Sequence, residues 1–235
     1  MNPSDIPERA LFIYAHPDDI EFSVAGTAAI WAQHGAEITY LVITDGNVGS
    51  HDPDLSREDV AAIRRTEQTA AAKMVGATCV FLGHDDGLLQ PTLALRKELV
   101  RHIRQIKPTA VICGDPALYF RGDGYINHPD HRAAGLATIE AVFPAAEMHL
   151  LYPDLLDEGL GGHKVNDVYI SWPGEKPNYY VDISDVIDLK MDALHCHTSQ
   201  FTDWDPEEQI RKWNADAGKR AGFAYAELFN RMRLG

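Results

Sequence analysis

The chain has 235 residues, of which 45% are hydrophobic and 24% are charged, a composition typical of globular proteins. Its 35 acidic residues outnumber its 21 basic residues, and the formal net charge is −14. Because nucleic acids and anionic membrane surfaces bind proteins mainly through Lys and Arg, this charge argues against both as partners.

Short apolar segments alternate with helical patterns through the first half of the chain. Strands are expected at residues 11–15, 38–43, 80–82 and 110–113, and helices over residues 24–34, 56–75 and 95–106. Ser56 is expected to cap the second helix, with Asp59 three residues later. The strand segments are short, continuous and rich in β-branched residues, which favours a parallel sheet covered on both faces. The alternation indicates βαβ units with right-handed crossovers.

The second half of the chain is less regular. Residues 167–172 and 179–183 are predicted to form two strands separated by a turn rich in Pro and Gly. Ser184 is expected to cap a helix that runs towards Gln200, and a further helix is expected to begin near Pro206. No internal repeat or long linker divides the sequence. We therefore expect a single domain over residues 1–235 with a mostly parallel α/β sheet.

A polar cluster follows each of the first four expected strands. The clusters fall within residues 15–21, 44–49, 83–87 and 114–132, and each contains Asp together with His or Gly. In an open α/β sheet, ligands bind outside the carboxyl ends of the strands. We therefore expect the four clusters to converge on one site although they are far apart in sequence.

Two of the clusters contain His-Pro-Asp and suggest a metal site. His16 and Asp19 are three residues apart, so one turn after the strand can direct both to the same point, while Asp18 must point elsewhere. His128 and His131 offer a further ligand at the same spacing, and the spacing does not decide between them. Two imidazoles and a carboxylate without cysteine suit Zn²⁺ or Fe²⁺ and leave a position for water, as in catalytic metal sites.

The remaining groups of these two clusters suit hydrolysis. A bound metal lowers the pKa of water to about 7 and polarises a carbonyl group. Asp18 can then take the proton of the water as a general base. The histidine of the second cluster that does not bind metal can stabilise an oxyanion or protonate a leaving amine. Asp130 can hold that imidazole in the required tautomer.

The order of these motifs resembles the LmbE-like, or PIG-L, family of metal-dependent deacetylases. Its two signatures are matched by Ala-His-Pro-Asp-Asp at residues 15–19 and by Asn-His-Pro-Asp-His-Arg at residues 127–132. Further matches, in the same order along the chain, are Thr-Asp-Gly at residues 44–46, Arg-x-x-Glu at residues 64–67, Asp-Gly at residues 86–87 and His-Thr-Ser-Gln at residues 197–200. Both signatures in order, each at the end of an expected strand, make the resemblance specific.

The resemblance implies a Rossmann-like three-layer α/β fold with Zn²⁺ at the strand ends. It implies hydrolysis of an N-acyl amide, often on N-acetylglucosamine. It also implies metal ligation by His16, Asp19 and His131, with Asp18 as the base and His128, paired to Asp130, as the oxyanion or acid partner. The choice of His131 over His128 as ligand rests on this resemblance.

Four further residues are candidates for substrate binding, each with an alternative role. Arg64 resembles a position near the substrate, or pairs with Glu67 on its own helix. Asp86 is expected to bond sugar hydroxyls, or to shape a turn. His197 resembles a histidine at the edge of the pocket, or makes a helix contact. Tyr125 lies one residue before the place where some family members carry a tyrosine that assists the oxyanion.

The segment from residue 151 to residue 178 matches nothing in the family pattern, so we expect loops that determine specificity there. Trp172 in this segment and Tyr179 directly after it are candidates for stacking on a sugar. Packing in the core or on the surface is the alternative for both aromatics.

The sequence therefore predicts a Zn²⁺-dependent amidohydrolase, with Fe²⁺ as the other metal, whose small-molecule substrate is an N-acetylated amino sugar or its conjugate. The alternatives are a non-sugar amide or a hydration at the same metal, or a non-catalytic protein that binds metal or sugar. An intact Asp18 argues against the non-catalytic alternative. Because no signal-peptide pattern, no long apolar run and no cysteine pairing pattern is present, we expect a cytoplasmic protein. Whether it forms a homo-oligomer is left open.

Overall fold

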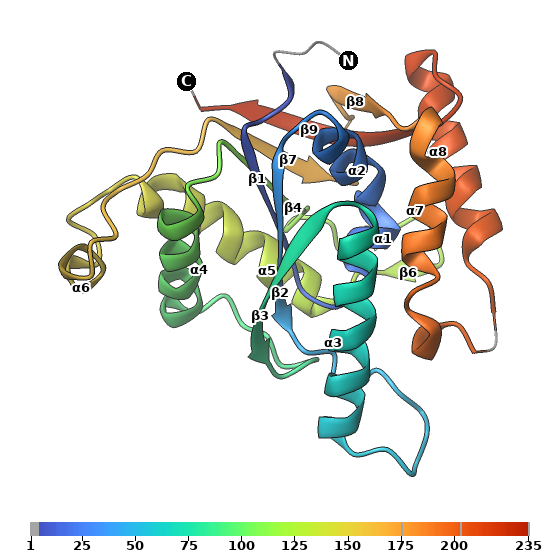
Figure 1. The fold of residues 1–235 in the computed structure, drawn as a ribbon, viewed down its shortest axis with the longest axis horizontal. Coiled ribbons are helices and arrows are strands. Elements are labelled where there is room, and N and C mark those ends of the chain that lie inside the picture. The colour runs from blue at the N-terminus through green and yellow to red at the C-terminus, as the bar shows by residue number, and fades with distance from the viewer. Residues whose placement is uncertain (1–4, 175, 203, 235) are drawn as a thin grey trace.

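The computed structural model describes residues 5–174, 176–202 and 204–234, and its centre is a seven-stranded sheet (Figure 1). The strands lie in the order β3-β2-β1-β4-β7-β9-β8. The five strands from β3 to β7 in this order are parallel, whereas β9 is antiparallel to both of its neighbours. The bounds of the seven strands are β1 Arg9–Tyr14, β2 Glu37–Thr44, β3 Ala77–His84, β4 Ala110–Gly114, β7 Asp167–Ser171, β8 Tyr179–Asp182 and β9 Ala226–Arg233. The predicted mostly parallel α/β sheet is confirmed.

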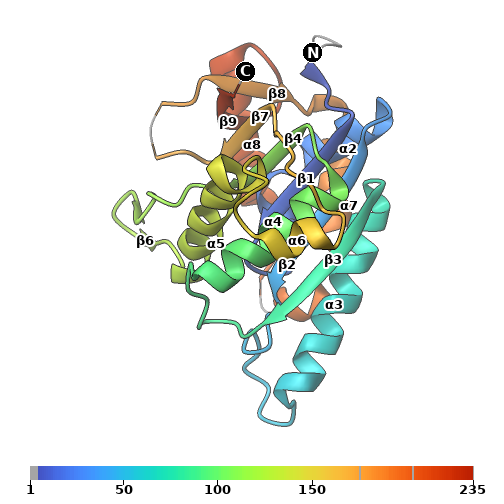
Figure 2. The same ribbon diagram turned by 90° about the vertical axis from the view of Figure 1, so that its left-hand side faces the viewer.

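Helices cover both faces of this sheet and complete three layers. The helices α2, α3 and α7 lie on one face, and Figure 2 turns towards the viewer the side on which α4 and α5 lie. The helix bounds are α1 Asp19–Ser23, α2 Ala25–Gln33, α3 Arg57–Met74, α4 Leu93–Ile106, α5 Pro129–Glu140, α6 Pro153–Asp157, α7 Ile187–Leu194 and α8 Glu207–Ala221. A small hairpin of β5 (Phe120–Arg121) and β6 (Tyr125–Ile126) precedes α5.

The apolar sequence of β1 explains why both faces are covered. Phe12 packs into the core cluster under α2 and α7, whereas Leu11 and Ile13 pack into the cluster under α4 and α5. All three side chains are fully buried. Because successive residues of a strand point to opposite faces, a continuous apolar run needs two apolar layers. Each such side chain contributes about 1.5–3 kcal/mol on burial.

The element boundaries agree with the sequence in the first half and differ in the second. The expected cap of α3 is confirmed, since the Ser56 side chain accepts from the Asp59 N–H and the Asp59 carboxylate accepts from the Ser56 N–H. The helix expected to run towards Gln200 ends at Leu194, because His197 then turns into the interior. The two strands expected around residues 167–183 do not pair with each other, since β9 lies between them.

The order of the strands places a crevice at the centre of the sheet. From β1 the chain proceeds outwards through β2 to β3 and then crosses back to β4, on the other side of β1. Such a reversal separates the loops that follow β1 and β4, and ligands of α/β proteins bind at this point. Within the described residues, no helix has the length and apolar character needed to cross a membrane.

Candidate active site

The loop after β1 has a strained backbone that is fixed by α3. Asp18 has a φ of 86°, in the left-handed region that non-glycine residues rarely adopt. Its backbone N–H donates to Gln68 Oε1 at 2.9 Å. Arg64 donates from Nη2 to Pro17 O at 2.6 Å and to Asp18 Oδ2 at 2.9 Å. Backbone strain of this kind persists where the surroundings determine it and is concentrated at functional sites.

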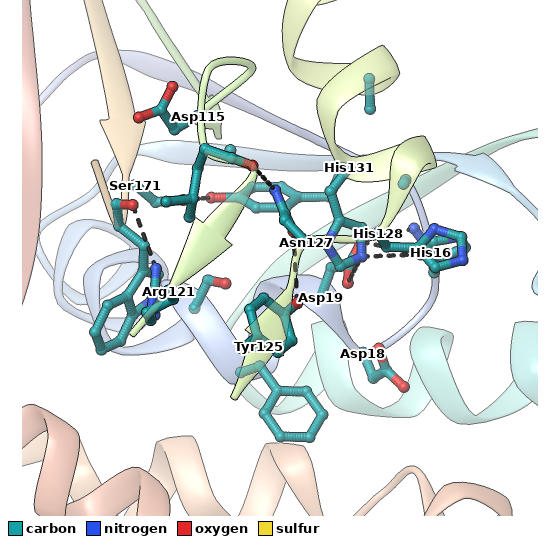
Figure 3. A pocket seen from close by; sticks show the side chains of 18 of the residues that line it. His16, Asp18, Asp19, Asp115, Arg121, Tyr125, Asn127, His128, His131 and Ser171 are labelled. Carbon is teal, nitrogen blue, oxygen red and sulfur yellow. Dashed lines mark hydrogen bonds and ion pairs between the residues drawn. The ribbon is translucent and has the colours of Figure 1, made fainter. Parts of the chain in front are cut away.

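The second signature forms the start of α5. His128 is the N-cap residue and Pro129 occupies the first turn, where its missing N–H costs nothing. His131 Nδ1 lies 3.0 Å from Asn127 Oδ1, and this contact directs His131 Nε2 into the crevice. There Nε2 lies 3.0 Å from Asp19 Oδ1 and 3.2 Å from His16 Nδ1 (Figure 3).

The three predicted ligand atoms fit a metal ion. His16 Nδ1 lies 3.5 Å from Asp19 Oδ2, so the two imidazole nitrogens and the nearer Asp19 carboxylate oxygen of each lie 3.0–3.5 Å apart. Tetrahedral Zn²⁺ with bonds of about 2.0–2.2 Å places its ligand atoms roughly 3.3–3.6 Å apart. The nitrogens of His16, His128 and His131 also lie within 4.8 Å of one another. We therefore regard this cluster as a candidate metal site.

His16 and His131 each carry an oxygen partner on the nitrogen that faces away from the candidate metal site. Asn127 serves His131, and His16 Nε2 lies 2.9 Å from Asp86 Oδ1 and 3.3 Å from Asp130 Oδ2. Such partners fix the tautomer and orientation of metal-bound histidines. The fit of the site to a metal thus extends beyond the ligand atoms themselves.

This arrangement corrects the partner expected for Asp130 and gives Asp86 a contact with a histidine. The carboxylate of Asp130 contacts His16 and accepts from the Gly87 and Leu89 N–H groups, whereas His128 was its expected partner. Asp130 is the second residue of α5 and fully buried, so its carboxylate reaches across to the loop after β3. Asp86 contacts His16 through Oδ1 and also lines the pocket, so its contact with a sugar hydroxyl stays a prediction.

His128 is left with one nitrogen available to the pocket. The backbone N–H of Asp130 donates to His128 Nδ1 at 3.3 Å, which places the proton of a neutral imidazole on Nε2. Burial lowers the pKa of His128, and the nearby His16 and His131 lower it further. A neutral His128 with Nε2–H is a hydrogen-bond donor, as oxyanion stabilisation requires.

The acidic groups differ in their pKa shifts. Burial raises the pKa of Asp18, the Arg64 charge opposes this shift and the Asp19 charge adds to it. Burial also acts against ionised Asp19, but His131 and His16 hold its pKa well below the usual range. Asp19 therefore stays ionised, as a metal ligand must be, whereas the pKa of Asp18 is shifted in the direction that favours a general base.

The pKa of His16 reflects the surplus of carboxylates. Burial acts to lower it, but the hydrogen bonds to Asp130, Asp19 and Asp86 raise it well above the usual value. A cation at the ligand atoms competes with this proton, because a ligand imidazole must be neutral. The same negative surroundings that hold the proton favour a divalent cation in its place.

Arg64 and His197 are both buried, and of the two only Arg64 lies at the pocket, where it was expected. Arg64 lines the pocket but holds Asp18 and the loop carbonyls, while Glu67 bonds Thr198 and Ser199. His197 is fully buried and is absent from the pocket lining.

His197 instead belongs to a buried chain of hydrogen bonds. It pairs with Glu21 at 3.2 Å, and Glu21 accepts from Gln68 Nε2 at 3.0 Å. Because Gln68 also bonds the Asp18 N–H, this chain ends at the strained loop. No sequence pattern pointed to Gln68, whose role depends on a contact 50 residues away.

The site opens into a pocket of about 740 Å³, within the size range of small-molecule sites. Tyr125 lines it and is 47% exposed, as its predicted place near the substrate requires. Trp172 also lines the pocket, whereas Tyr179 packs against Tyr169 and Arg231. Trp204 and Trp213 also line the pocket. Neither was predicted, because both lie outside any sequence motif.

Comparisons with known proteins show which family and which structures the chain resembles. Residues 11–142 match the family model described as PIG-L: GlcNAc-PI de-N-acetylase. The chain is 36% identical over 231 residues to the diacetylchitobiose deacetylase of Thermococcus kodakarensis, covering 96% of this chain and 83% of that protein.

Two solved structures share the fold. N,N'-diacetylchitobiose deacetylase from Pyrococcus horikoshii, complexed with its inhibitor MPG, has a TM-score of 0.91 at 33% identity, covering 99% of this chain and 86% of that chain. GalB, the 4-carboxy-2-hydroxymuconate hydratase from Pseudomonas putida KT2440, has a TM-score of 0.78 at 22% identity, covering 96% of each chain. The second likeness shows the fold alone, and the fold by itself does not fix the reaction.

Proposed function

Because the chain belongs to the PIG-L de-N-acetylase family, as its two signatures predicted, we propose that it is a metal-dependent N-deacetylase of an amino sugar or amino-sugar conjugate. The relative from Thermococcus kodakarensis is a deacetylase, that is, an amidohydrolase acting on an N-acetyl amide bond. The observation that carries the proposal is the convergence of His16, Asp19 and His131 beside an Asp18 carboxylate that bonds none of them.

We assign Zn²⁺ to these three residues, with Fe²⁺ as the other metal that the donor set accepts. When bound, the ion would supply a Lewis acid for the acyl carbonyl and lower the pKa of a water molecule. The Asp86 and Asp130 carboxylates would orient the His16 ligand, and Asn127 would orient the His131 ligand.

The chain's own residues would then carry the proton transfers. Asp18, whose pKa is raised by burial, takes the proton of the attacking water and returns it to the leaving nitrogen when the C–N bond breaks. His128 donates from Nε2 to the oxyanion that forms at the acyl carbon. Arg64 holds the Asp18 carboxylate and the Pro17 carbonyl, so the base keeps its direction through the reaction.

The cysteines support the expected reducing compartment. Cys79, Cys113 and Cys196 are free thiols. Burial raises the pKa of the Cys79 thiol to about 12, which keeps it protonated and unreactive. We therefore propose that the protein acts in the cytoplasm on a small-molecule substrate.

The test is metal analysis combined with an assay of acetate release from N-acetylated sugars. We expect near one metal ion per chain, loss of activity with a chelator and its return with Zn²⁺ or Fe²⁺. His131→Ala should lose both the metal and the activity. The control is His195→Ala, because His195 lies in a separate cluster with Asp205 and Glu207 and should retain both. Stoichiometric metal in His131→Ala would refute the ligand assignment, and acetate release that resists chelation would refute metal dependence.

A further inference from the structure

Two buried hydroxyl groups that the proposed reaction does not use line the pocket. Tyr14 is the last residue of β1 and Ser171 is the last residue of β7, and both belong to the pocket lining. Their side-chain oxygens are 2.6 Å apart and form a hydrogen bond. Figure 3 shows Ser171 on the side of the pocket away from His16. The pair therefore joins two strand ends directly beneath the space that receives a substrate.

The strand between these two ends leaves open space at the same level of the sheet. β4 lies between β1 and β7, and its last residue, Gly114, pairs in register with Ser171. Gly114 lines the pocket as well. A Cβ atom built on it would meet no heavy atom of the described residues within 4 Å, its chain neighbours aside. A glycine inside a strand often marks a place where a ligand comes close to the backbone.

The open space and the two hydroxyls lie on the same face of the sheet. Tyr14 belongs to the core cluster under α2 and α7, as do Ile112 of β4 and Tyr169 of β7. Gly114 and Ser171 each come two positions after one of these residues, and residues two apart in a strand point to the same face. A ligand group that enters the space at Gly114 therefore comes between the two strands that carry the hydroxyls.

The pair keeps hydrogen-bonding capacity that the protein does not use. Each hydroxyl has one hydrogen to donate and two lone pairs that accept. The bond between Tyr14 and Ser171 uses one hydrogen, whichever of the two donates, and neither hydroxyl has another partner among the described residues. One O–H group is thus left for an acceptor outside the chain. Because a buried donor without an acceptor is costly, the pair favours a ligand that supplies one.

We propose that Tyr14 and Ser171 bind one hydroxyl group of the N-acetylated sugar ring, which enters the space at Gly114. A sugar hydroxyl both accepts and donates, so it extends the pair into a chain of three hydroxyls whose bonds strengthen one another. The pair is uncharged, so it suits a neutral hydroxyl better than a carboxylate or phosphate, whose strong partners are charged. The inference rests on the proposed deacetylase function, which it deepens by naming residues that select among N-acetylated sugars.

The experiment tests whether the pair and one sugar hydroxyl act on each other. Acetate release is measured for N-acetylglucosamine and for four analogues that each lack the hydroxyl at C1, C3, C4 or C6. The metal-loaded wild type is compared with the double variant Tyr14→Phe/Ser171→Ala. For one analogue, kcat/KM relative to the parent sugar should fall about three- to tenfold in the wild type and not fall in the double variant. A pair that only supports the fold would lower kcat/KM for all five sugars by one factor, and unchanged ratios would overturn the proposal.

Two further substitutions test the open space and the specificity of the effect. Gly114→Val should raise KM about tenfold or more by filling the space, and Gly114→Ala should raise it less. An unchanged KM in both variants would overturn the placement of the sugar hydroxyl at Gly114. Tyr40→Phe is the matched control, because Tyr40 is a buried tyrosine of β2 that lies outside the pocket lining, and its hydroxyl has no partner among the described residues. It should leave the ratios between the five sugars unchanged.

Binding is measured separately, so that failure of the hydroxyl pair and failure of the proposed function are distinguishable. Ligand-observed NMR titration of the five sugars into metal-loaded Asp18→Asn, with and without the two hydroxyl substitutions, reports affinity without turnover. The expected loss for one analogue, seen in affinity while no acetate is released by the wild type, would support the pair and count against the deacetylase function alone. Acetate release with unchanged ratios would overturn the pair alone, and binding of none of the five sugars would overturn both.

Discussion

The two ends of the pocket are built by different physical means. At the metal end, every polar side chain has a defined partner: Asp18 bonds Arg64, His131 bonds Asn127, and His16 bonds Asp86 and Asp130. At the aromatic end, Trp172 and Trp213 pack against each other, and half-exposed indole faces the solvent. The first end fixes charges and protons, whereas the second offers an apolar surface.

This difference separates the residues that carry out the reaction from the residues that discriminate between substrates. Removal of a group that acts on the reacting atoms weakens the binding of the transition state of every substrate by about the same factor. Removal of a group that contacts only a remote part of a substrate changes the ratio between substrates. Substitutions at the metal end should therefore lower kcat/KM by the same factor for two substrates, N-acetylglucosamine and a larger conjugate of it, and substitutions of Trp172 or Trp213 should not. The variants below test this separation from the larger effect to the smaller.

The largest effect is expected for the base. Asp18→Asn keeps the size of the side chain and an oxygen for Arg64 but cannot take a proton. Removal of a general base costs 10²–10⁴-fold, so we expect kcat to fall by about that factor on both substrates. The metal content should stay near one ion per chain, since the Asp18 carboxylate bonds Arg64 and none of the ligand atoms.

The matched control for this variant is Asp85→Asn. Asp85 lies in the loop after β3, accepts from Asn47 and is exposed. It should retain full activity and full metal content. A near-normal kcat for Asp18→Asn would show that Asp18 is not the base and that another group of the pocket takes the proton.

A smaller effect is expected for the residues that orient the metal ligands. Asp130→Asn weakens the contact to His16 and removes one of the acceptors for the Gly87 and Leu89 N–H groups. Loss of such a partner weakens metal affinity by about 10–100-fold. Metal competition with a fluorescent chelator measures this affinity, and excess metal should restore most of the activity.

The Asp130 variant also decides between its two assigned partners. If the carboxylate served His128, as the sequence analysis expected, kcat would fall while metal affinity stayed unchanged. Asp86→Asn provides the comparison, because Asp86 contacts the same nitrogen of His16. Since both residues act on one imidazole, the effects of the two substitutions on metal affinity should not add.

The residues of the metal end could be predicted from the sequence because they lie close together in it. His16, Asp18 and Asp19 lie within four positions of one another, and the three-residue spacing is repeated at His128 and His131. Their strands were visible as apolar runs, and the geometry of a parallel sheet brings the strand ends together. Short-range pattern and topology were thus sufficient to predict that these residues converge, whereas the choice of His131 over His128 as a ligand needed the family resemblance.

The remaining parts of the pocket depend on contacts that no local pattern encodes. Trp172 and Trp213 are 41 positions apart and meet only because α8 packs beside β9, a strand that the sequence analysis did not predict. Asp130 turns to His16, 114 residues away, although His128 is its near neighbour in sequence. The partner of a buried polar group is decided by tertiary packing, so sequence spacing alone assigned it incorrectly.

The smallest effect at the metal end is expected for Gln68, which acts through the backbone of the loop. Gln68→Leu preserves much of the volume but removes the bonds to the Asp18 N–H and to Glu21. Because Glu21 is fully buried, its carboxylate would keep only His197 as a side-chain partner among the described residues. A weakly satisfied buried group costs about 1–3 kcal/mol, which urea unfolding should show as lower stability.

The same change should also affect catalysis in the molecules that remain folded. Without its bond to Gln68, the left-handed Asp18 backbone loses one of the contacts that fix it, and a misplaced base reacts more slowly. We expect kcat to fall by about tenfold for both substrates, with KM and metal content unchanged. Gln33→Leu, at an exposed position at the end of α2, is the control. If activity fell only in proportion to the folded fraction, the chain from His197 to Asp18 would support the fold without positioning the base.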